Sequence, residues 1–161
     1  MSYQIDSDPI QDMEQEIKQA KKKAMYLLEK QDRTESQLRT KLLDKGFSQE
    51  ACDEAIAYVK SFHYVDDERY ACNYVRYRAH SKSRQQLKLD LLKKGVSREI
   101  IASALEEEYE GDERAMICEI LVKKKFDPET ADYKEKNRIT AFLLRRGFAL
   151  EDIRSCMRDV E

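Results

Sequence analysis

The 161-residue sequence has few of the residues that interrupt helices: it contains four glycines and two prolines, and it has no tryptophan. This composition predicts helices joined by short connections, and no window alternates apolar and polar residues for long enough to require a strand. Only two histidines are present, which argues against a histidine-based catalyst or a zinc site. The four cysteines form no Cys-x-x-Cys pair, and we expect them to be buried, reduced thiols.

Motifs that would mark an enzyme or a membrane protein are also missing. No apolar run approaches the roughly 18–20 residues of a membrane span, and the acidic N-terminal residues do not resemble a secretory signal. Each of the four glycines stands alone, so the chain has no glycine-rich phosphate loop. We therefore expect a cytoplasmic protein without a membrane span, an active site, a metal ion or a cofactor.

Three segments of the sequence repeat one pattern: LRTKLLDKGFS (38–48), LKLDLLKKGVS (87–97) and ITAFLLRRGFA (139–149). Each has an aliphatic residue eight positions before a glycine, a Leu-Leu pair, and a basic residue directly before the glycine. The aliphatic residue and the first leucine lie on one face of a helix. The glycine stands where a helix needs a left-handed residue at its end. Residues 34–37 (TESQ) and 83–86 (SRQQ) fit the capping box that begins such a helix.

The pattern continues past each glycine and predicts a three-helix repeat. Gly46, Gly95 and Gly147 are 49 and 52 residues apart, and each is followed four residues later by a glutamate. Apolar residues at i, i+3 and i+4 then form one stripe of a further helix. The nine expected helices run near 12–31, 34–45, 48–62, 66–81, 83–94, 97–109, 112–126, 129–146 and 149–159.

Repeats of this size bury little apolar surface alone, so we expect them to stack into an elongated, curved array of the all-α class. The expected parts are an N-terminal extension with the start of the first helix at 1–23, and repeats at 24–69, 70–111 and 112–161. The third repeat carries the segment FDPETADYK (126–134). In it, Asp127-Pro128 is typical of a helix cap followed by a first-turn proline.

The charge is spread unevenly, although the total is only −2. Between residues 76 and 98, eight basic residues accompany a single acid, Asp90; between 123 and 146, eight accompany four acids. Charges act within a Debye length of ~8–10 Å, so these clusters attract a polyanion despite the acidic total. Solvated faces of ordinary helices explain the same pattern, and that alternative stays open. The candidate binding residues are Arg76, Arg78, Lys82, Arg84, Lys88, Lys93, Lys94, Lys123, Lys124, Lys125, Lys136, Arg138, Arg145 and Arg146.

Four segments resemble the RecX family of recombination regulators. They are RTESQLRTKLLDKGF (33–47), YVDDERYA (64–71), QLKLDLLKKGVSREII (86–101) and FLLRRGFALEDI (142–153). The second is similar to the family's segment aromatic-x-Asp-Asp-x-Arg-aromatic-Ala, here carried by Asp66, Asp67 and Arg69. His63 stands where glycine is common in the family.

The resemblance implies a non-enzymatic protein that binds the filament of RecA recombinase on DNA and inhibits its recombinase and ATPase activities. In that family the array is thought to lie along the helical groove of the filament. The basic residues would then contact DNA or acidic filament surface, and the acidic segment would contact basic residues of the recombinase. Because the repeats supply neighbours for one another, we expect a monomer.

Two other functions are compatible with the residues. Three-helix modules with a glycine-containing turn are similar to helix-turn-helix domains, so the chain is alternatively a direct DNA-binding protein. A helical adaptor without any role in nucleic-acid binding is the third possibility.

Overall fold

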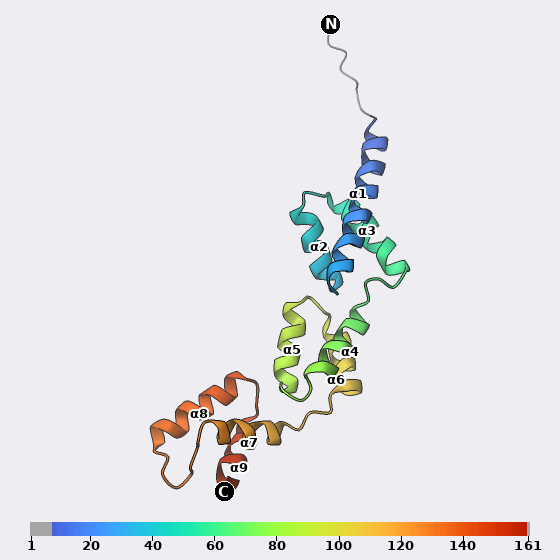
Figure 1. Ribbon diagram of the computed structural model, residues 1–161. Helices are drawn as coiled ribbons and strands as arrows, with labels where there is room; N and C mark the ends of the chain where they lie inside the picture. Colours follow the sequence, from blue (N-terminus) through green and yellow to red (C-terminus); the bar gives the residue numbers. More distant parts are fainter. Residues whose placement is uncertain (1–7, 161) are drawn as a thin grey trace. The chain divides into compact units, whose positions relative to one another are not determined.

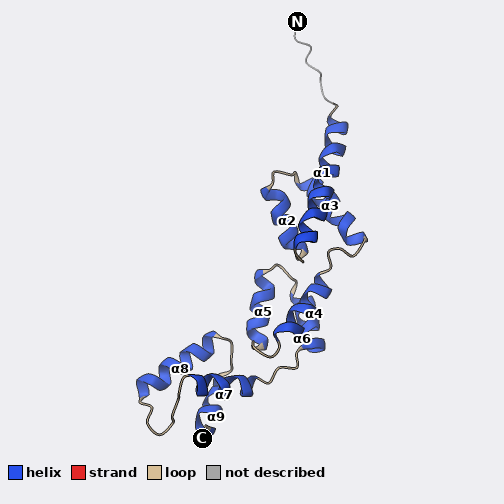
Figure 2. Ribbon diagram, viewed as in Figure 1, coloured by secondary structure: helices blue, strands red, loops and turns tan. Residues whose placement is uncertain are grey.

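The computed structural model describes residues 8–160, and every regular element within that range is an α-helix (Figures 1 and 2). The helices are α1 (Pro9–Lys30), α2 (Glu35–Asp44), α3 (Gln49–Ser61), α4 (Asp67–Arg78), α5 (Arg84–Lys93), α6 (Arg98–Glu108), α7 (Glu113–Lys123), α8 (Tyr133–Arg145) and α9 (Leu150–Asp159). The predicted all-α class with three tandem three-helix repeats is confirmed for the described residues. The elongated, curved shape and the repeat boundaries stay predictions.

The helices belong to two compact units, which are described separately. Within the described range, unit 1 comprises residues 8–70 and 94–96, and unit 2 comprises residues 71–93 and 97–160. None of the helices in these residues is long and apolar enough to cross a lipid bilayer.

The core of unit 1 is formed by α1, α2 and α3 and is rich in alanine. Ala20 and Ala24 of α1, and Ala51 and Ala55 of α3, are fully buried. Such short side chains let the two helices pack closely against each other. The remaining buried residues of this core are Leu27, Leu38, Leu42, Cys52, Ile56, Val59 and Val65.

The buried positions of unit 2 follow the repeated sequence pattern. Leu87 and Leu91 of α5 are buried, as are Ile139 and Leu143 of α8. By contrast Leu144, the second leucine of its pair, is 45% exposed. The first aliphatic residue and the first leucine of the pattern therefore face the core, as predicted. The core around α7, α8 and α9 also contains Met116, Ile117, Leu121, Phe126, Phe148, Ile153 and Cys156.

The three repeat glycines adopt the left-handed conformation that the sequence predicts. The backbone φ angle is +93° at Gly46, +83° at Gly95 and +88° at Gly147. After the last of these, the N–H of Phe148 donates to the carbonyl of Leu143 at 3.2 Å, which closes the end of α8. Since glycine adopts this conformation at least cost, it ends each middle helix.

Thr34 and Ser83, the residues before α2 and α5, have buried side chains that make two hydrogen bonds each. Each hydroxyl accepts from the backbone N–H three residues later, at 3.1 Å in both cases. Thr34 Oγ1 also donates to the carbonyl of Lys94 at 2.6 Å, and Ser83 Oγ donates to the carbonyl of Arg146 at 2.7 Å. Both hydroxyls are therefore satisfied, and each ties a helix start to a distant turn.

The predicted capping box is complete at only one of these two helix starts. At Thr34 it is complete, because the Gln37 side chain accepts from the Thr34 N–H. At Ser83 only the hydroxyl half forms, and the Gln86 side chain donates to Asp90 instead.

A carboxylate satisfies the next N–H group at the same two helix starts. In unit 1, Asp67 Oδ1 accepts from the N–H of Glu35 at 2.8 Å. In unit 2, Glu113 Oε1 accepts from the N–H of Arg84 at 2.8 Å. The first N–H groups of a helix have no partner within it, so each carboxylate satisfies a donor and complements the positive end of the helix.

The predicted start of α8 is wrong. We expected Asp127 to cap a helix from 129, but α8 begins at Tyr133 and is capped by Asp132, which accepts from the N–H of Glu135 at 2.8 Å. Asp127 instead accepts from the N–H of Glu129, two residues later, at 2.9 Å. A short carboxylate side chain forms such a local turn as readily as a helix cap, and the sequence alone does not separate the two.

The prediction of buried cysteines is correct for two of the four. None of the four cysteines, all of which lie in the described residues, forms a disulfide, but only Cys52 and Cys156 are buried, whereas Cys72 and Cys118 are partly exposed. Burial, together with a hydrogen bond with Cys118, raises the pKa of Cys156 to about 11. Its thiolate is therefore scarce at neutral pH, as is usual for a thiol in the core.

Candidate nucleic-acid interface

The basic residues of the second repeat extend from the end of α4 along α5. Arg76 and Arg78 lie in the last turn of α4, Lys82 lies in the connection, and Arg84, Lys88 and Lys93 lie on α5. All of these belong to unit 2, whereas Lys94 belongs to unit 1. Which of them can bind a partner depends on which charges are already paired within the protein.

Arg76 is paired with an acid of its own unit. Its guanidinium makes two hydrogen bonds to Glu108 at the end of α6, from Nε to Oε2 at 3.0 Å and from Nη2 to Oε1 at 2.8 Å. A bidentate pair between an arginine and a carboxylate has a fixed geometry and little net charge. Arg76 therefore links α4 to α6 and contributes little free positive charge to the cluster.

Asp90, the single acid of the cluster, accepts three hydrogen bonds. The donors are Lys82 Nζ at 2.7 Å, the Tyr74 hydroxyl at 3.0 Å and Gln86 Nε2 at 2.9 Å. The guanidinium carbon of Arg78 lies 3.8 Å from the centroid of the Tyr74 ring. Lys82 and Arg78 are therefore held by a polar network that joins α4 to α5.

The network lowers the pKa of Asp90. Burial by itself raises this pKa, but the hydrogen bonds from Lys82, Gln86 and Tyr74 outweigh burial and bring it below the ordinary value of 3.8. A carboxylate whose pKa is lower in the folded protein contributes stability that is fully present above its unfolded-state pKa. That stability is lost as the pH falls through the folded-state pKa.

We expect the substitution Asp90→Asn to reduce the free energy of unfolding at neutral pH, and the difference from the unsubstituted protein to shrink below the ordinary pKa of 3.8. The measurement is urea unfolding of both proteins from about pH 7 to about pH 3. A difference that stays constant over this range would show that the charge of the carboxylate does not stabilise the network.

Lys88 and Lys93 differ from these paired residues. Both side chains are exposed and make no ion pair, hydrogen bond or ring contact within residues 8–160. Arg84 is intermediate, because its guanidinium carbon lies 5.2 Å from the ring centroid of Tyr109. Most of the available charge of this cluster therefore lies on α5, and the exposed Arg98 at the start of α6 adds to it.

Some basic residues of the third repeat are also engaged. Lys123 pairs with Glu119, one turn earlier on α7, at 3.2 Å. Lys124 Nζ and the guanidinium carbon of Arg146 lie 4.0 Å and 4.6 Å from the centroid of the Phe142 ring. Cations held over a ring keep their charge but lose much of their freedom to move.

Other basic residues of the third repeat are available to a partner. Lys125 follows α7 in the left-handed conformation, with φ of +56°, and its side chain is exposed. Lys136, Arg138 and Arg145 lie on α8 with exposed side chains and without a pairing contact in the described part of the chain. Arg138 and Arg145 are seven residues apart, so they share one face of the helix.

A hollow of about 460 Å³ in unit 2 is the place where the two basic clusters meet. Lys82 and Arg146 both line it, beside Ser83 and Phe148. The hydrogen bond from Ser83 to the carbonyl of Arg146 holds its two sides together. The hollow is large enough for an anionic group. However, the ammonium group of Lys82 is already paired with Asp90, so it offers such a group little free charge.

Comparison with known proteins follows the same three-repeat division. Models of the first, second and third three-helix domains of RecX match residues 20–58, 66–105 and 112–157. This chain belongs to the RecX family. The resemblance inferred from the sequence is therefore confirmed, and with it a place in a family of regulatory proteins.

Individual RecX proteins agree with this assignment. Regulatory protein RecX of Caldanaerobacter subterraneus subsp. tengcongensis is 36% identical over 143 residues, which cover 88% of this chain and 71% of that protein. Regulatory protein RecX of Clostridium perfringens strain 13 is 33% identical over 163 residues, which cover 96% and 75%. The crystal structure of RecX from Lactobacillus salivarius has the same fold, with a TM-score of 0.72, 23% identity, and coverage of 91% of this chain and 97% of that one.

The acidic segment of the RecX signature makes contacts within unit 1. Asp66 Oδ1 accepts from the N–H of Arg69 at 3.0 Å and so caps α4, while Asp67 caps α2. Burial raises the pKa of Asp67. The Arg69 guanidinium donates to the carbonyl of His63 at 2.9 Å, and His63 itself has a φ of +58°. The left-handed conformation is one that glycine adopts at least cost, which is consistent with the expectation from the sequence that glycine is common here in the family. Contact of the segment with a partner stays a prediction.

Sequence reasoning missed a further group of lysines on α1. Residues 18–30, KQAKKKAMYLLEK, contain five lysines and one glutamate, but the expected boundary between residues 23 and 24 divides this run. Counting charge along one helix, rather than within each expected domain, would have found it.

Proposed function

We propose that this chain is a non-enzymatic regulator that binds the RecA recombinase–DNA filament, inhibits its recombinase and ATPase activities, and so modulates recombination and DNA repair. The observation that carries the proposal is the match of all three repeats to RecX domains. The protein would act in the cytoplasm as a monomer, without a metal ion or a cofactor.

The distribution of charge supports this proposal. Basic side chains that have no partner among residues 8–160 lie on the middle helices α5 and α8, at Lys88, Lys93, Lys136, Arg138 and Arg145. The total charge of −2 is unlike that of a protein that binds free DNA through many phosphates. A chain with nearly neutral total charge and local groups of basic side chains is suited to bind a partner whose surface contains both protein and phosphate groups.

The experiment that tests the proposal is the single-stranded-DNA-dependent ATPase of the cognate RecA filament, with this protein added from trace to equimolar amounts. We expect ATP hydrolysis to fall as the protein is added. Inhibition at trace amounts would indicate capping of filament ends, whereas inhibition only near saturation would indicate binding along the filament. An unchanged ATPase rate with folded protein, verified by circular dichroism, would refute the proposal.

Direct binding of DNA by the three-helix modules is the second candidate function, and the exposed bases of α5 and α8 favour it. Its test is the salt dependence of binding to free duplex DNA. The logarithm of the affinity should fall with the logarithm of salt by roughly 0.9 for each phosphate contacted. A nearly flat response would exclude this function.

A further inference from the structure

The lysines of α1 form one surface of unit 1 together with aromatic side chains of α3 and the segment that follows it. Four aromatic residues of unit 1 are exposed: Tyr26 by 51%, Tyr58 by 38%, Phe62 by 53% and Tyr64 by 47%. Tyr58 and Phe62 meet edge to face with 5.1 Å between ring centroids, and Phe62 and Tyr64 are stacked at 5.7 Å. The three contacting rings of Tyr58, Phe62 and Tyr64 are an unusually apolar cluster for a surface that contacts only water.

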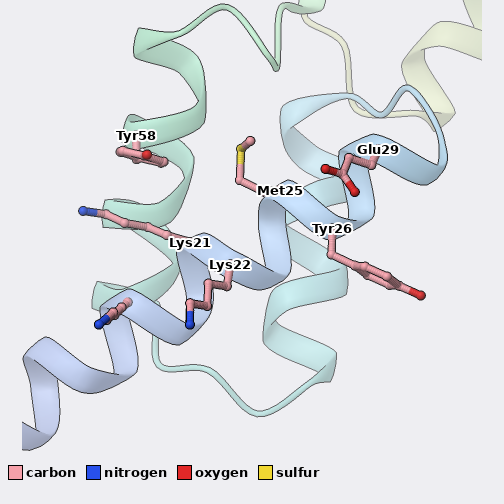
Figure 3. Close-up of a pocket in the computed structure, with 7 residues that line it drawn as sticks. Lys21, Lys22, Met25, Tyr26, Glu29 and Tyr58 are labelled. Atoms are coloured by element: carbon pink, nitrogen blue, oxygen red, sulfur yellow. The ribbon is translucent and has the colours of Figure 1, made fainter.

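Lysine side chains of α1 lie over the rings of Tyr26, which belongs to α1 itself, and Tyr58, which belongs to α3. Lys21 Nζ lies 4.8 Å from the centroid of the Tyr58 ring, and Lys23 Nζ lies 4.9 Å from that of Tyr26. Figure 3 shows Lys21 extending toward Tyr58, while Tyr26 points away from the other flank of the helix. Each tyrosine therefore presents a flat ring and a cation within about 5 Å of each other.

Two adjoining hollows connect these flanks across the exposed face of α1. The first, of about 480 Å³, is lined by Lys18, Lys21, Lys22, Tyr26 and Tyr58, with Met25 and the single carboxylate Glu29. The second, of about 450 Å³, is lined in part by Lys22, Lys23 and Tyr26. Because Lys22 and Tyr26 line both, the hollows form one continuous basic track with a ring on each flank.

We propose that this lysine–tyrosine surface, composed of Lys18, Lys21, Lys22, Lys23, Tyr26 and Tyr58, binds single-stranded nucleic acid. On binding, bases replace the ammonium groups that lie over the rings of Tyr26 and Tyr58, and they stack on these faces. The displaced lysines pair with the phosphates of the same nucleotides. Aromatic platforms with cations beside them bind single strands with little sequence preference, because every base has a flat face. In a duplex the base faces are stacked on one another and are not available to the tyrosines.

The chemistry of the surface favours a nucleic acid over an acidic protein segment. An acidic peptide would need the lysines but would make no use of the exposed rings of Tyr26 and Tyr58. A nucleotide uses both, because its base and its phosphate lie close together on one backbone. The surface belongs to unit 1 and shares no residue with the interface on α5 and α8, so this proposal does not rest on regulation of the RecA filament.

The test is the anisotropy of a labelled single-stranded oligothymidylate of about 12 nucleotides, titrated with the full chain. We expect the variants Tyr26→Leu and Tyr58→Leu each to weaken binding by about tenfold, because leucine keeps the apolar bulk but removes the stacking face. The matched control is Tyr133→Leu, which removes an 81%-exposed tyrosine of unit 2 and should leave the affinity unchanged.

An oligonucleotide of the same length in which the bases are replaced by abasic sites separates stacking from charge. It keeps every phosphate, so the unsubstituted protein should bind it about as weakly as the leucine variants bind the intact strand. Equal affinity for the abasic and intact strands, or intact affinity in both leucine variants, would overturn the proposal. Binding of a glutamate-rich peptide without binding of the oligonucleotide would also overturn it, and would identify an acidic protein as the ligand.

This readout uses free oligonucleotide and no recombinase. If the oligonucleotide does not bind, the proposal of a single-strand site fails, but a measured inhibition of the filament ATPase still stands. If the protein does not inhibit the filament ATPase, the anisotropy measurement still tests the single-strand site. Repeating the titration with Lys88, Lys93 and Arg145 changed to glutamate removes any contribution of the interface in unit 2. The two leucine substitutions should have the same effect in that background.

Discussion

Changing Lys88, Lys93 and Arg145 together to glutamate is expected to raise the amount of protein needed for half-inhibition of the RecA filament ATPase by about tenfold to hundredfold. These three side chains are exposed and have no partner within the described residues, so their reversal breaks no internal contact. The measurement is the same ATPase titration, with circular dichroism to verify the fold. Substitution of Arg76 is less informative, because it also breaks the pair with Glu108.

The control for this variant reverses three other exposed bases, Lys41, Arg154 and Arg158, and so changes the total charge equally. Inhibition by the control should be nearly unchanged. If both variants lose inhibition to the same degree, total charge and not the α5–α8 surface determines binding. The salt dependence adds a second result: its slope should fall by about one for each lost contact to phosphate, and stay constant if the lost contacts are to the recombinase.

The substitution Gly147→Ala is expected to destabilise unit 2 by about 3–5 kcal/mol, far more than a change of one methyl group suggests. Its backbone is left-handed, which costs alanine about 1–2 kcal/mol. A Cβ atom would also lie 2.7 Å from Ser83 Oγ and 3.2 Å from the backbone nitrogen of Gln86. It would therefore displace the capping hydroxyl that donates to the carbonyl of Arg146.

Gly46→Ala is the matched control for this prediction. Gly46 has the same left-handed conformation, but a Cβ atom there would meet no atom within 4 Å. It should cost only the backbone term of about 1–2 kcal/mol. Urea unfolding of the two variants measures both values. Equal costs would show that the close approach to Ser83 does not matter and that only the backbone conformation does.

The local features of the fold were accessible from the sequence because they depend on residues close together in the chain. The Leu38–Leu42 spacing, the glycine φ angles and the hydroxyl caps all follow from the geometry of a single helix and its ends. Helix α1 begins at Pro9 rather than near 12, and the largest error in a helix start arose where Asp127 and Asp132 compete as caps. Both have the right side chain, and only the packing of the third repeat selects between them.

The candidate interface was less accessible. The sequence located the basic clusters, but it treated every base as equally available. In the structure Arg76, Lys82 and Lys123 are paired, while Lys88 and Lys93 have no ion pair with any residue that the structure describes. The acid that pairs with Arg76 lies 32 residues away on α6, and no spacing rule relates positions on different helices.

By itself, the sequence determined the all-α class, the three repeats, the ends of most helices and membership of the RecX family. These follow from short-range spacing and from motifs that local backbone geometry requires. The tertiary structure alone decided which basic side chains are already paired. It also decided that the buried hydroxyls of Thr34 and Ser83 bond to the carbonyls of Lys94 and Arg146. It placed Tyr58 of α3 beside Lys21 of α1. These contacts join residues far apart in the chain, so they depend on how helices pack, which periodicity along one helix does not specify.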